Sequence, residues 1–139
     1  MSETVRFGIS LSQQLLDQFD QHIKKKNYTN RSEAIRDLIR EELVRSEWEA
    51  DDTDCVGTIS IVYNHHTGEL VKKLLDLQHD YGKLIISTTH IHMDHDNCLE
   101  VIVVSGKGRE LKQLRNKLKS IRGVTHVRLS SSTRGNKLS

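Results

Sequence analysis

Apolar and polar residues alternate over residues 5–11. Side chains of a strand point alternately to opposite faces, so this alternation predicts a half-buried strand. Its apolar face consists of Phe7, Ile9 and Leu11, and its opposite face consists of Arg6, Gly8 and Ser10. Beyond this segment the apolar positions follow the period of a helix instead.

Two amphipathic helices are predicted after the strand. The first is capped by Ser10 or Ser12 and ends at residues 24–26, three lysines whose charge suits the negative end of a helix. The second begins at Asn30, and Glu33 three residues later gives the pattern of a capping box. One strand and two short helices cannot bury enough apolar surface alone. We therefore expect two copies to pair their strands and share one core.

The second half of the chain alternates between strand-like and helix-like patterns. Residues 49–55 are acidic and lack a periodic apolar pattern, so they are interpreted as a linker. The expected elements are a strand at 56–63, a helix at 69–77, strands at 83–93 and 98–105, a helix at 109–121 and a strand at 124–130. This β-α-β-β-α-β order is that of a ferredoxin-like domain, here residues 56–131. Residues 132–139 are interpreted as a polar, disordered tail.

Composition excludes several classes of protein. The formal charge of +2 is too small by itself to indicate nucleic-acid binding. There is no apolar run near the length of a membrane span and no signal-peptide pattern, so we expect a cytoplasmic protein with no membrane partner. The two cysteines stand far apart in the sequence and do not suggest a disulfide framework.

Histidines gather in one part of the chain: of eight in total, four fall within residues 79–95. On a strand, His90 and His92 project from the same face, about 6.8 Å apart along it. Residues 94–97 are turn-forming and can fold Cys98 back beside them. Two imidazoles and one thiolate at one point make a transition-metal site with at least one coordination position left to fill.

Three stretches carry a resemblance to a known family. They are Arg6-Phe7-Gly8-Ile9-Ser10-Leu11, then Asn30-Arg31-Ser32-Glu33-Ala34-Ile35-Arg36-Asp37, then Gln78-His79 with Thr89-His90-Ile91-His92 and Cys98-Leu99-Glu100. With them the chain resembles the nickel-responsive transcriptional regulators of the NikR family over nearly its whole length. The resemblance implies an α+β protein with a ribbon-helix-helix DNA-binding domain in residues 1–48 and an ACT-like metal-binding and tetramerisation domain in residues 56–131. It also implies a homotetramer, a dimer of dimers, with the regulatory domains at its centre.

The resemblance further implies a ligand set. The family's nickel ligands fall on His90, His92 and Cys98 of one subunit and on His79 of a neighbour, with one Ni(II) per subunit. These donors suit Ni(II) in a square-planar field, whereas a tetrahedral arrangement suits zinc, and copper(II) binds at least as tightly, so nickel rests on the resemblance. The family places further groups around the site at Tyr63, His65, Gln78 and Glu100. We interpret His95 as a neighbour of the site, and His22, His66 and His126 as solvated or structural.

The polar face of the predicted ribbon is the expected DNA-reading surface, because a two-stranded ribbon can enter the major groove. There Arg6 can bond guanine bidentately and Ser10 can contact several bases. Family members commonly carry a hydroxyl residue at the position of Gly8, so we expect a different operator preference. Glu33 and Asp37 lie one helical turn apart and are candidates for a second cation site, which in the family often holds potassium.

The sequence therefore predicts a nickel-dependent transcriptional regulator that binds a palindromic operator and is not an enzyme. By resemblance it represses nickel uptake, with nickel ordering residues 79–98 at the tetramer centre and favouring operator binding. Because linkage is reciprocal, operator DNA must then tighten nickel binding by the same factor. Two alternatives remain open at this point. One is a DNA-binding regulator that senses another metal or a small ligand; the other is a zinc-dependent enzyme, which is disfavoured by the lack of an H-E-x-x-H or P-C-x-x-C signature.

Overall fold

The structure, a computed structural model that describes residues 3–139, divides into two compact units. Among the described residues, the first comprises residues 3–43 with Gly135–Ser139, and the second comprises Val44–Arg134. We call them the N-terminal and C-terminal units and describe each by itself. No helix among the described residues is both long enough and apolar enough to cross a membrane.

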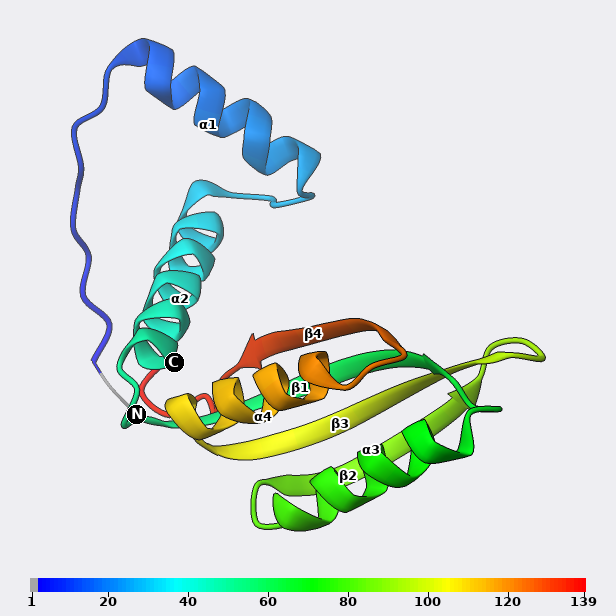
Figure 1. Ribbon diagram of the computed structural model, residues 1–139. Helices are drawn as coiled ribbons and strands as arrows, with labels where there is room; N and C mark the ends of the chain where they lie inside the picture. The colour runs from blue at the N-terminus through cyan, green and yellow to red at the C-terminus, as the bar shows by residue number, and fades with distance from the viewer. Residues whose placement is uncertain (1–2) are drawn as a thin grey trace. The chain divides into compact units, whose positions relative to one another are not determined.

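The two predicted helices of the N-terminal unit are present, as α1 (Gln13–Lys25) and α2 (Arg31–Glu49), the last turns of α2 belonging to the C-terminal unit (Figure 1). The Ser12 hydroxyl accepts a hydrogen bond from the Leu15 amide at 3.2 Å. Asn30 accepts one from the Glu33 amide at 2.8 Å. Both helices therefore begin at polar residues that the sequence indicated, because the first amides of a helix need acceptors outside it.

The predicted strand at residues 5–11 differs from expectation. Within residues 3–139 this segment forms no strand, and the side chains of Phe7, Ile9 and Leu11 are exposed instead of half-buried. A strand needs a partner for its backbone and a covered face for its apolar side chains. The described part of a single chain supplies neither, which agrees with the expectation that the ribbon forms between two copies.

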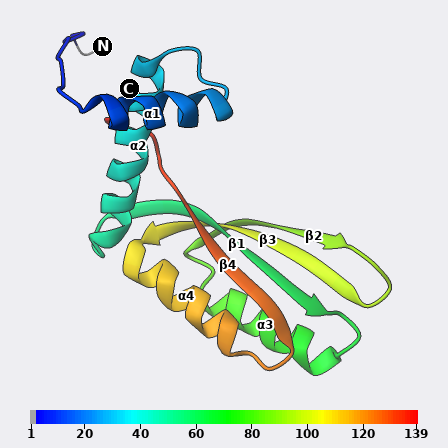
Figure 2. The same cartoon turned by 90° about the horizontal axis from the view of Figure 1, so that it is seen from above.

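The C-terminal unit is a four-stranded antiparallel sheet in the order β2-β3-β1-β4 with two helices. Its elements in chain order are β1 (Asp54–Asn64), α3 (Gly68–Asp80), β2 (Ile85–His92), β3 (Asn97–Lys107), α4 (Gly108–Ser120) and β4 (Val124–Ser132). The predicted βαββαβ order is thus confirmed. Figure 2 shows α3 and α4 on the same side of the sheet, which leaves its other face without helices.

The core of this unit lies between the sheet and its helices. Along β1 every second residue is buried, from Cys55 to Tyr63, because alternate side chains of a strand share one face. From the helices, Leu74 of α3 and Leu111 and Leu114 of α4 pack into the same cluster. The strand and helix periods seen in the sequence therefore meet in one apolar layer.

The C-terminal residues are not the free tail expected from their polar composition. The carbonyl of Ser132 accepts a hydrogen bond from Trp48 Nε1 at 2.9 Å, and the Thr133 hydroxyl donates to Glu47 at 3.2 Å. In the N-terminal unit, Arg40 donates to the carbonyl of Leu138 at 2.9 Å. The indole N–H of a buried Trp needs an acceptor, and here the chain end provides it.

Candidate metal centre and DNA-reading segment

The hairpin of β2 and β3 positions the predicted ligands. Its register sets His92 opposite Cys98 and His90 opposite Glu100. The turn between the strands is closed by the Met93 amide, which donates to the Asn97 carbonyl at 3.0 Å. Directly opposed residues of an antiparallel pair share a face. Since Cys98 and Glu100 are buried under the helices, both histidines project to the same side of the sheet.

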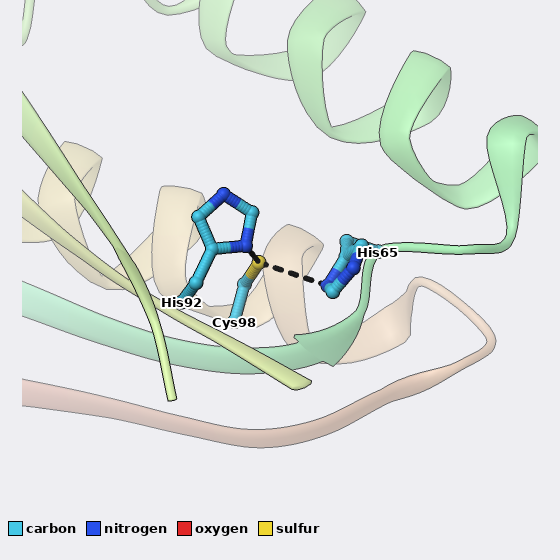
Figure 3. Close-up of side chains that lie close together, drawn as sticks. All are labelled: His65, His92 and Cys98. Atoms are coloured by element: carbon cyan, nitrogen blue, oxygen red, sulfur yellow. Dashed lines mark hydrogen bonds between the residues drawn. The ribbon is translucent and has the colours of Figure 1, made fainter. Parts of the chain in front are cut away.

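Two imidazoles lie against the thiol of Cys98 (Figure 3). The Sγ atom of Cys98 is 3.4 Å from Nδ1 of His92 and 3.2 Å from Nδ1 of His65. With bonds of about 2.3 Å to sulfur and about 2.0 Å to nitrogen, neighbouring ligands of one ion lie about 3.1 Å apart at a right angle and about 3.5 Å apart in a tetrahedron. The observed distances fall in this range, so the spacing of the Cys98 sulfur from each imidazole nitrogen is compatible with a shared transition-metal ion.

The direct contact of His65 with the Cys98 thiol was not predicted from the sequence. The resemblance placed His65 near the site but outside the ligand set. It follows the last residue of β1, and its amide donates to the Asp96 carbonyl at 3.1 Å, which holds the end of β1 beside the β2–β3 turn. Partial burial, followed by the nearby imidazoles of His66 and His92, lowers the pKa of His65. A neutral imidazole at neutral pH can bind a metal ion or accept a hydrogen bond from a thiol.

His90 is oriented by a different set of groups. Its Nε2 lies 3.1 Å from a carboxylate oxygen of Glu100 and 3.2 Å from the hydroxyl of Tyr63. The buried carboxylate of Glu100 also accepts hydrogen bonds from Tyr63 at 3.3 Å and from Gln78 at 3.0 Å. Burial, and then the Glu100 carboxylate, raises the pKa of Tyr63, which keeps its hydroxyl protonated as a donor. Three of the four residues that the resemblance placed around the site, Tyr63, Gln78 and Glu100, therefore form one hydrogen-bonded group beside His90.

His79 lies apart from these groups within its own chain. It is the penultimate residue of α3, and its side chain is exposed. Residues 3–139 contain two groups of three or more His, Cys or acidic side chains close enough to share an ion. These are His65 with His92 and Cys98, and His66 with His95 and Asp96. His79 and His90 belong to neither group, so a single subunit does not bring the four predicted ligands together.

The predicted DNA-reading residues lie in the extended segment before α1. The residues from 5 to 11 are all exposed, Arg6 and Ser10 among them. At Gly8 an added Cβ meets nothing within 4 Å, so the single chain does not require glycine there.

The two carboxylates proposed for a second cation are already engaged. Glu33 accepts hydrogen bonds from Arg36, and Asp37 accepts them from the Tyr28 hydroxyl at 2.6 Å and from Arg40 at 2.9 Å. The Arg36 guanidinium lowers the pKa of Glu33, and the Tyr28 hydrogen bond followed by that from Arg40 lowers the pKa of Asp37. The negative charge of the pair is thus balanced by guanidinium groups in this structure.

Comparison with known families accounts for both units. Residues 56–132 match the model of the NikR C terminal nickel binding domain, which covers more than half of the chain. The chain belongs to the NikR family. Residues 5–46 match the model described as ribbon-helix-helix protein, copG family. These matches confirm the predicted family and show a regulator with a DNA-binding module, not an enzyme.

NikR-family relatives align over almost the whole chain. A protein from Syntrophus aciditrophicus that carries the name nickel-responsive regulator is 54% identical over 95% of this chain and 96% of its own length. A protein of the same name from Thermococcus kodakarensis is 52% identical over 96% of this chain and 97% of its own. Among solved structures, an uncharacterized protein from Thermotoga maritima has a TM-score of 0.52 at 16% identity over 56% of this chain and 96% of its own, which shows a shared fold alone.

Proposed function

We propose that this NikR-family protein is a nickel-dependent transcriptional regulator, a repressor of nickel uptake genes, active as a homotetramer on a palindromic operator. Residues 1–48 form its DNA-binding domain and residues 56–131 its metal-binding and tetramerisation domain, joined by residues 49–55. One Ni(II) per subunit is held by His90, His92 and Cys98 with His79 of a neighbouring subunit. The observation that carries the proposal is the pair of Cys98 Sγ and His92 Nδ1, 3.4 Å apart at the end of a hairpin.

The surroundings of each donor support its role. Cys98 is buried, and burial disfavours a thiolate unless a cation or hydrogen-bond donors stabilise it. His90 presents Nε2 to Glu100, and ligand imidazoles commonly donate their second ring N–H to a carboxylate. His90 Nδ1, which lies 3.4 Å from the Tyr63 hydroxyl, is then the nitrogen that would bind the metal ion. Glu100 in turn accepts hydrogen bonds from Tyr63 and Gln78. These bonds fix the Glu100 carboxylate, and the carboxylate orients the His90 ring.

The exposed position of His79 supports a site shared between subunits. A ligand that completes the site of a neighbour must lie on the surface of its own chain, as His79 does. With His79 on α3 and the other three ligands on β2 and β3, a bound Ni(II) would join two subunits through bonds to these elements. The tetramer geometry favoured by those bonds sets the separation of the two DNA-binding dimers, and therefore which operator half-sites they can reach together.

We also propose a site for a second cation, potassium, at Glu33 and Asp37. Glu33 and Asp37 can accept it only after Arg40 leaves them, because one guanidinium contacts both carboxylates. Displacement of Arg40 by a DNA phosphate would remove the one group that contacts both carboxylates, since phosphate is a strong guanidinium partner. Arg36 and the Tyr28 hydroxyl would still contact Glu33 and Asp37. Operator affinity should then be higher in potassium than in a larger monovalent cation at equal ionic strength.

The test uses full-length protein, Ni(II) titration followed by thiolate-to-nickel absorption, and DNA selected from a random pool. We expect wild-type protein to bind one Ni(II) per subunit with this absorption and to bind the selected DNA tightly only with nickel. Cys98→Ser should lose both properties, whereas Cys55→Ser, the matched control at the other buried cysteine, should keep both. His79→Ala should weaken nickel binding at least about 10-fold. Nickel-independent DNA binding by the wild type would overturn the proposal.

The pH dependence of nickel binding gives a second check. Three imidazoles must be neutral and one thiol ionised in the complex, so protons leave on binding. Nickel affinity should fall steeply between about pH 8 and about pH 6. An affinity that stays constant over this range would contradict the ligand set.

A further inference from the structure

The C-terminal end of α2 is capped by a residue of α4. The last carbonyls of a helix have no intrahelical donors and form the negative end of its dipole, so a cation is favoured beside them. α2 has no basic residue in its last turn. Lys112 of α4 supplies the cation instead, because its Nζ donates to the Trp48 carbonyl at 2.8 Å. The sequence of α2 alone leaves this end incomplete, and α4 completes it.

The N-terminal end of α4 is capped in turn by the segment after α2. The first amides of a helix need acceptors outside it, and the N-cap residue Lys107 has no acceptor in its side chain. The Thr53 carbonyl accepts the Gly108 amide at 3.1 Å. The Asp51 carbonyl accepts the Arg109 amide at 3.2 Å. α2 and α4 therefore cap each other, and we call residues 47–54 and 107–112 together the α2–α4 joint.

Opposite charges face each other across this joint. The segment after α2 is acidic, and the start of α4 is basic. The ion pairs between them are Lys112–Asp51 at 3.1 Å, Lys107–Asp54 at 3.4 Å and Arg109–Asp52. One exposed ion pair contributes little to stability, but here three act together with the helix caps. Loosening the joint therefore requires the removal of all three cations.

The indole of Trp48 holds the last turn of α2 in the core of the C-terminal unit. Trp48 is buried, and its Nε1 donates to the Ser132 carbonyl at 2.9 Å. A Cβ added at Gly57 of β1 would lie 3.1 Å from the indole ring and 2.6 Å from the Ser130 carbonyl, so glycine leaves the room that this packing needs. A large aromatic ring is strongly stabilising when it is buried with its N–H bonded. The joint thus combines an apolar anchor with ion pairs at the surface.

Strand β3 connects the proposed nickel site to the joint. It carries Cys98 as its second residue and ends at Lys107, the N-cap residue of α4. It pairs with β2 on one side and with β1 on the other, which restrains it along its length. Beyond the joint, α2 continues as one helix into the N-terminal unit. An unbroken series of regular elements therefore leads from Cys98 through β3 and the joint to α2.

We propose that the α2–α4 joint transmits nickel binding to the DNA-binding domain, with Lys107, Arg109 and Lys112 as positioning residues for nickel-dependent DNA binding. The inference rests on the proposed function, because it requires that nickel and operator binding are linked. Coupling between distant sites is carried by packed side chains, hydrogen-bond networks and rigid elements. With the joint closed, a change at Cys98 is passed to α2. With the joint open, nickel still binds, but the change is not passed on.

The test measures, for full-length variants, the ratio of the affinities for selected DNA with and without Ni(II). Lys107→Gln/Arg109→Gln/Lys112→Gln, the joint variant, removes the three cations. We expect its ratio to be at least about 10-fold smaller than that of the wild type, with unchanged thiolate-to-nickel absorption. The conservative exchange Lys107→Arg/Arg109→Lys/Lys112→Arg keeps all three cations and should keep most of the wild-type ratio.

The matched control is Arg115→Gln/Lys117→Gln/Lys119→Gln, which removes the same charge from the same helix outside the joint. Lost positive charge weakens the general attraction to DNA with and without nickel alike, so it cancels in the ratio. The control should therefore keep the wild-type ratio. An equally large fall in the control would overturn the inference, because the effect would then not depend on the joint.

Trp48 is the only tryptophan of the chain, so its fluorescence reports directly on the joint. The emission maximum should move to longer wavelength in the joint variant, as water reaches the indole, and stay in place in the control. An intact nickel response of the joint variant would overturn the inference alone. DNA binding by the wild type that does not respond to nickel would instead contradict the proposed function, and the inference with it.

Discussion

The two units of this chain bury their apolar side chains to very different extents. In the C-terminal unit, Ile59, Leu111 and Leu114 are each 0% exposed. In the N-terminal unit, Phe7 is 71% and Ile9 59% exposed, although their alternating pattern in the sequence is as regular as that of β1. The same kind of pattern thus gives a closed core in one unit and an open apolar face in the other.

The difference follows from what each unit can place on its apolar face. The C-terminal unit has four strands and covers one face of its sheet with α3 and α4. The N-terminal unit has one extended segment and two helices, which is too little to enclose a core. We therefore propose that a second copy of the chain covers the exposed apolar face of residues 5–11. The predictions below test this contrast.

The largest effect is expected in the closed core. Leu114→Ala removes a fully buried side chain and should lower the free energy of unfolding of the C-terminal unit by about 2–5 kcal/mol. Lys117→Ala, at an exposed position of the same helix, is the control and should leave it nearly unchanged. Chemical denaturation followed by circular dichroism measures both. Equal stability of the two variants would show that this unit has no closed core of its own.

The exposed apolar face of residues 5–11 should be sensitive to an added charge, because it has no closed core in which a smaller side chain would leave a cavity. Ile9→Asp places a carboxylate on the apolar face that we propose two copies share, and a buried unpaired charge is costly. We expect affinity for selected DNA to fall by about 100-fold or more, which is about 2.7 kcal/mol. Gln18→Asp adds the same charge at an exposed polar position of α1 and serves as the control. Nickel absorption should persist in both. If Ile9→Asp binds DNA like its control, the face is not an interface.

Arg6→Ala tests the opposite face of the same segment. Loss of a bidentate guanine contact costs about 1–3 kcal/mol of discrimination per site. Competition binding should show that selected DNA loses its advantage over random DNA, while affinity for random DNA falls much less. Stability and nickel absorption should match the wild type, because Arg6 is exposed. If the variant keeps full sequence preference, another part of the protein contacts the DNA bases.

The smallest effect concerns the Asp20–Arg31 ion pair, which joins α1 to α2 at 2.8 Å. The hydrogen bond from Arg31 lowers the pKa of Asp20. A lowered pKa in the folded state stabilises the fold above the ordinary pKa of Asp, about 4, and this contribution is lost as pH falls toward the lowered value. Asp20→Asn should therefore be slightly less stable than wild type at pH 7, with the difference vanishing in acid. A thermal unfolding difference that is constant with pH would exclude this linkage.

The metal centre shows where sequence reasoning succeeds and where it stops. The turn residues after His92 indicated that Cys98 folds back, and the structure places the two side chains together. The two-residue spacing of His90 and His92 indicated one shared face, which the hairpin register supports. Spacing alone did not indicate that His65, not His90, would touch the thiol. That outcome depends on pairing between β1 and β3, which lie far apart in sequence.

The second group, His66 with His95 and Asp96, had no signal in local spacing. Its members come from loops almost thirty residues apart and meet because β1, β2 and β3 are neighbours in the sheet. Likewise, the polar chain end was expected to be disordered. It is held because the indole of Trp48 and the guanidinium of Arg40 find carbonyl acceptors there.

Outside residues 5–11, the sequence by itself determined the elements of this protein, because helix and strand periods, caps and turns depend on residues close together in the chain. It also determined the family, and through it the regulatory role. Only the tertiary structure decided which donors are neighbours, since strand register brings together side chains with no relation in sequence. The same principle applies to residues 5–11, whose apolar pattern is local although their side chains are exposed in the single chain.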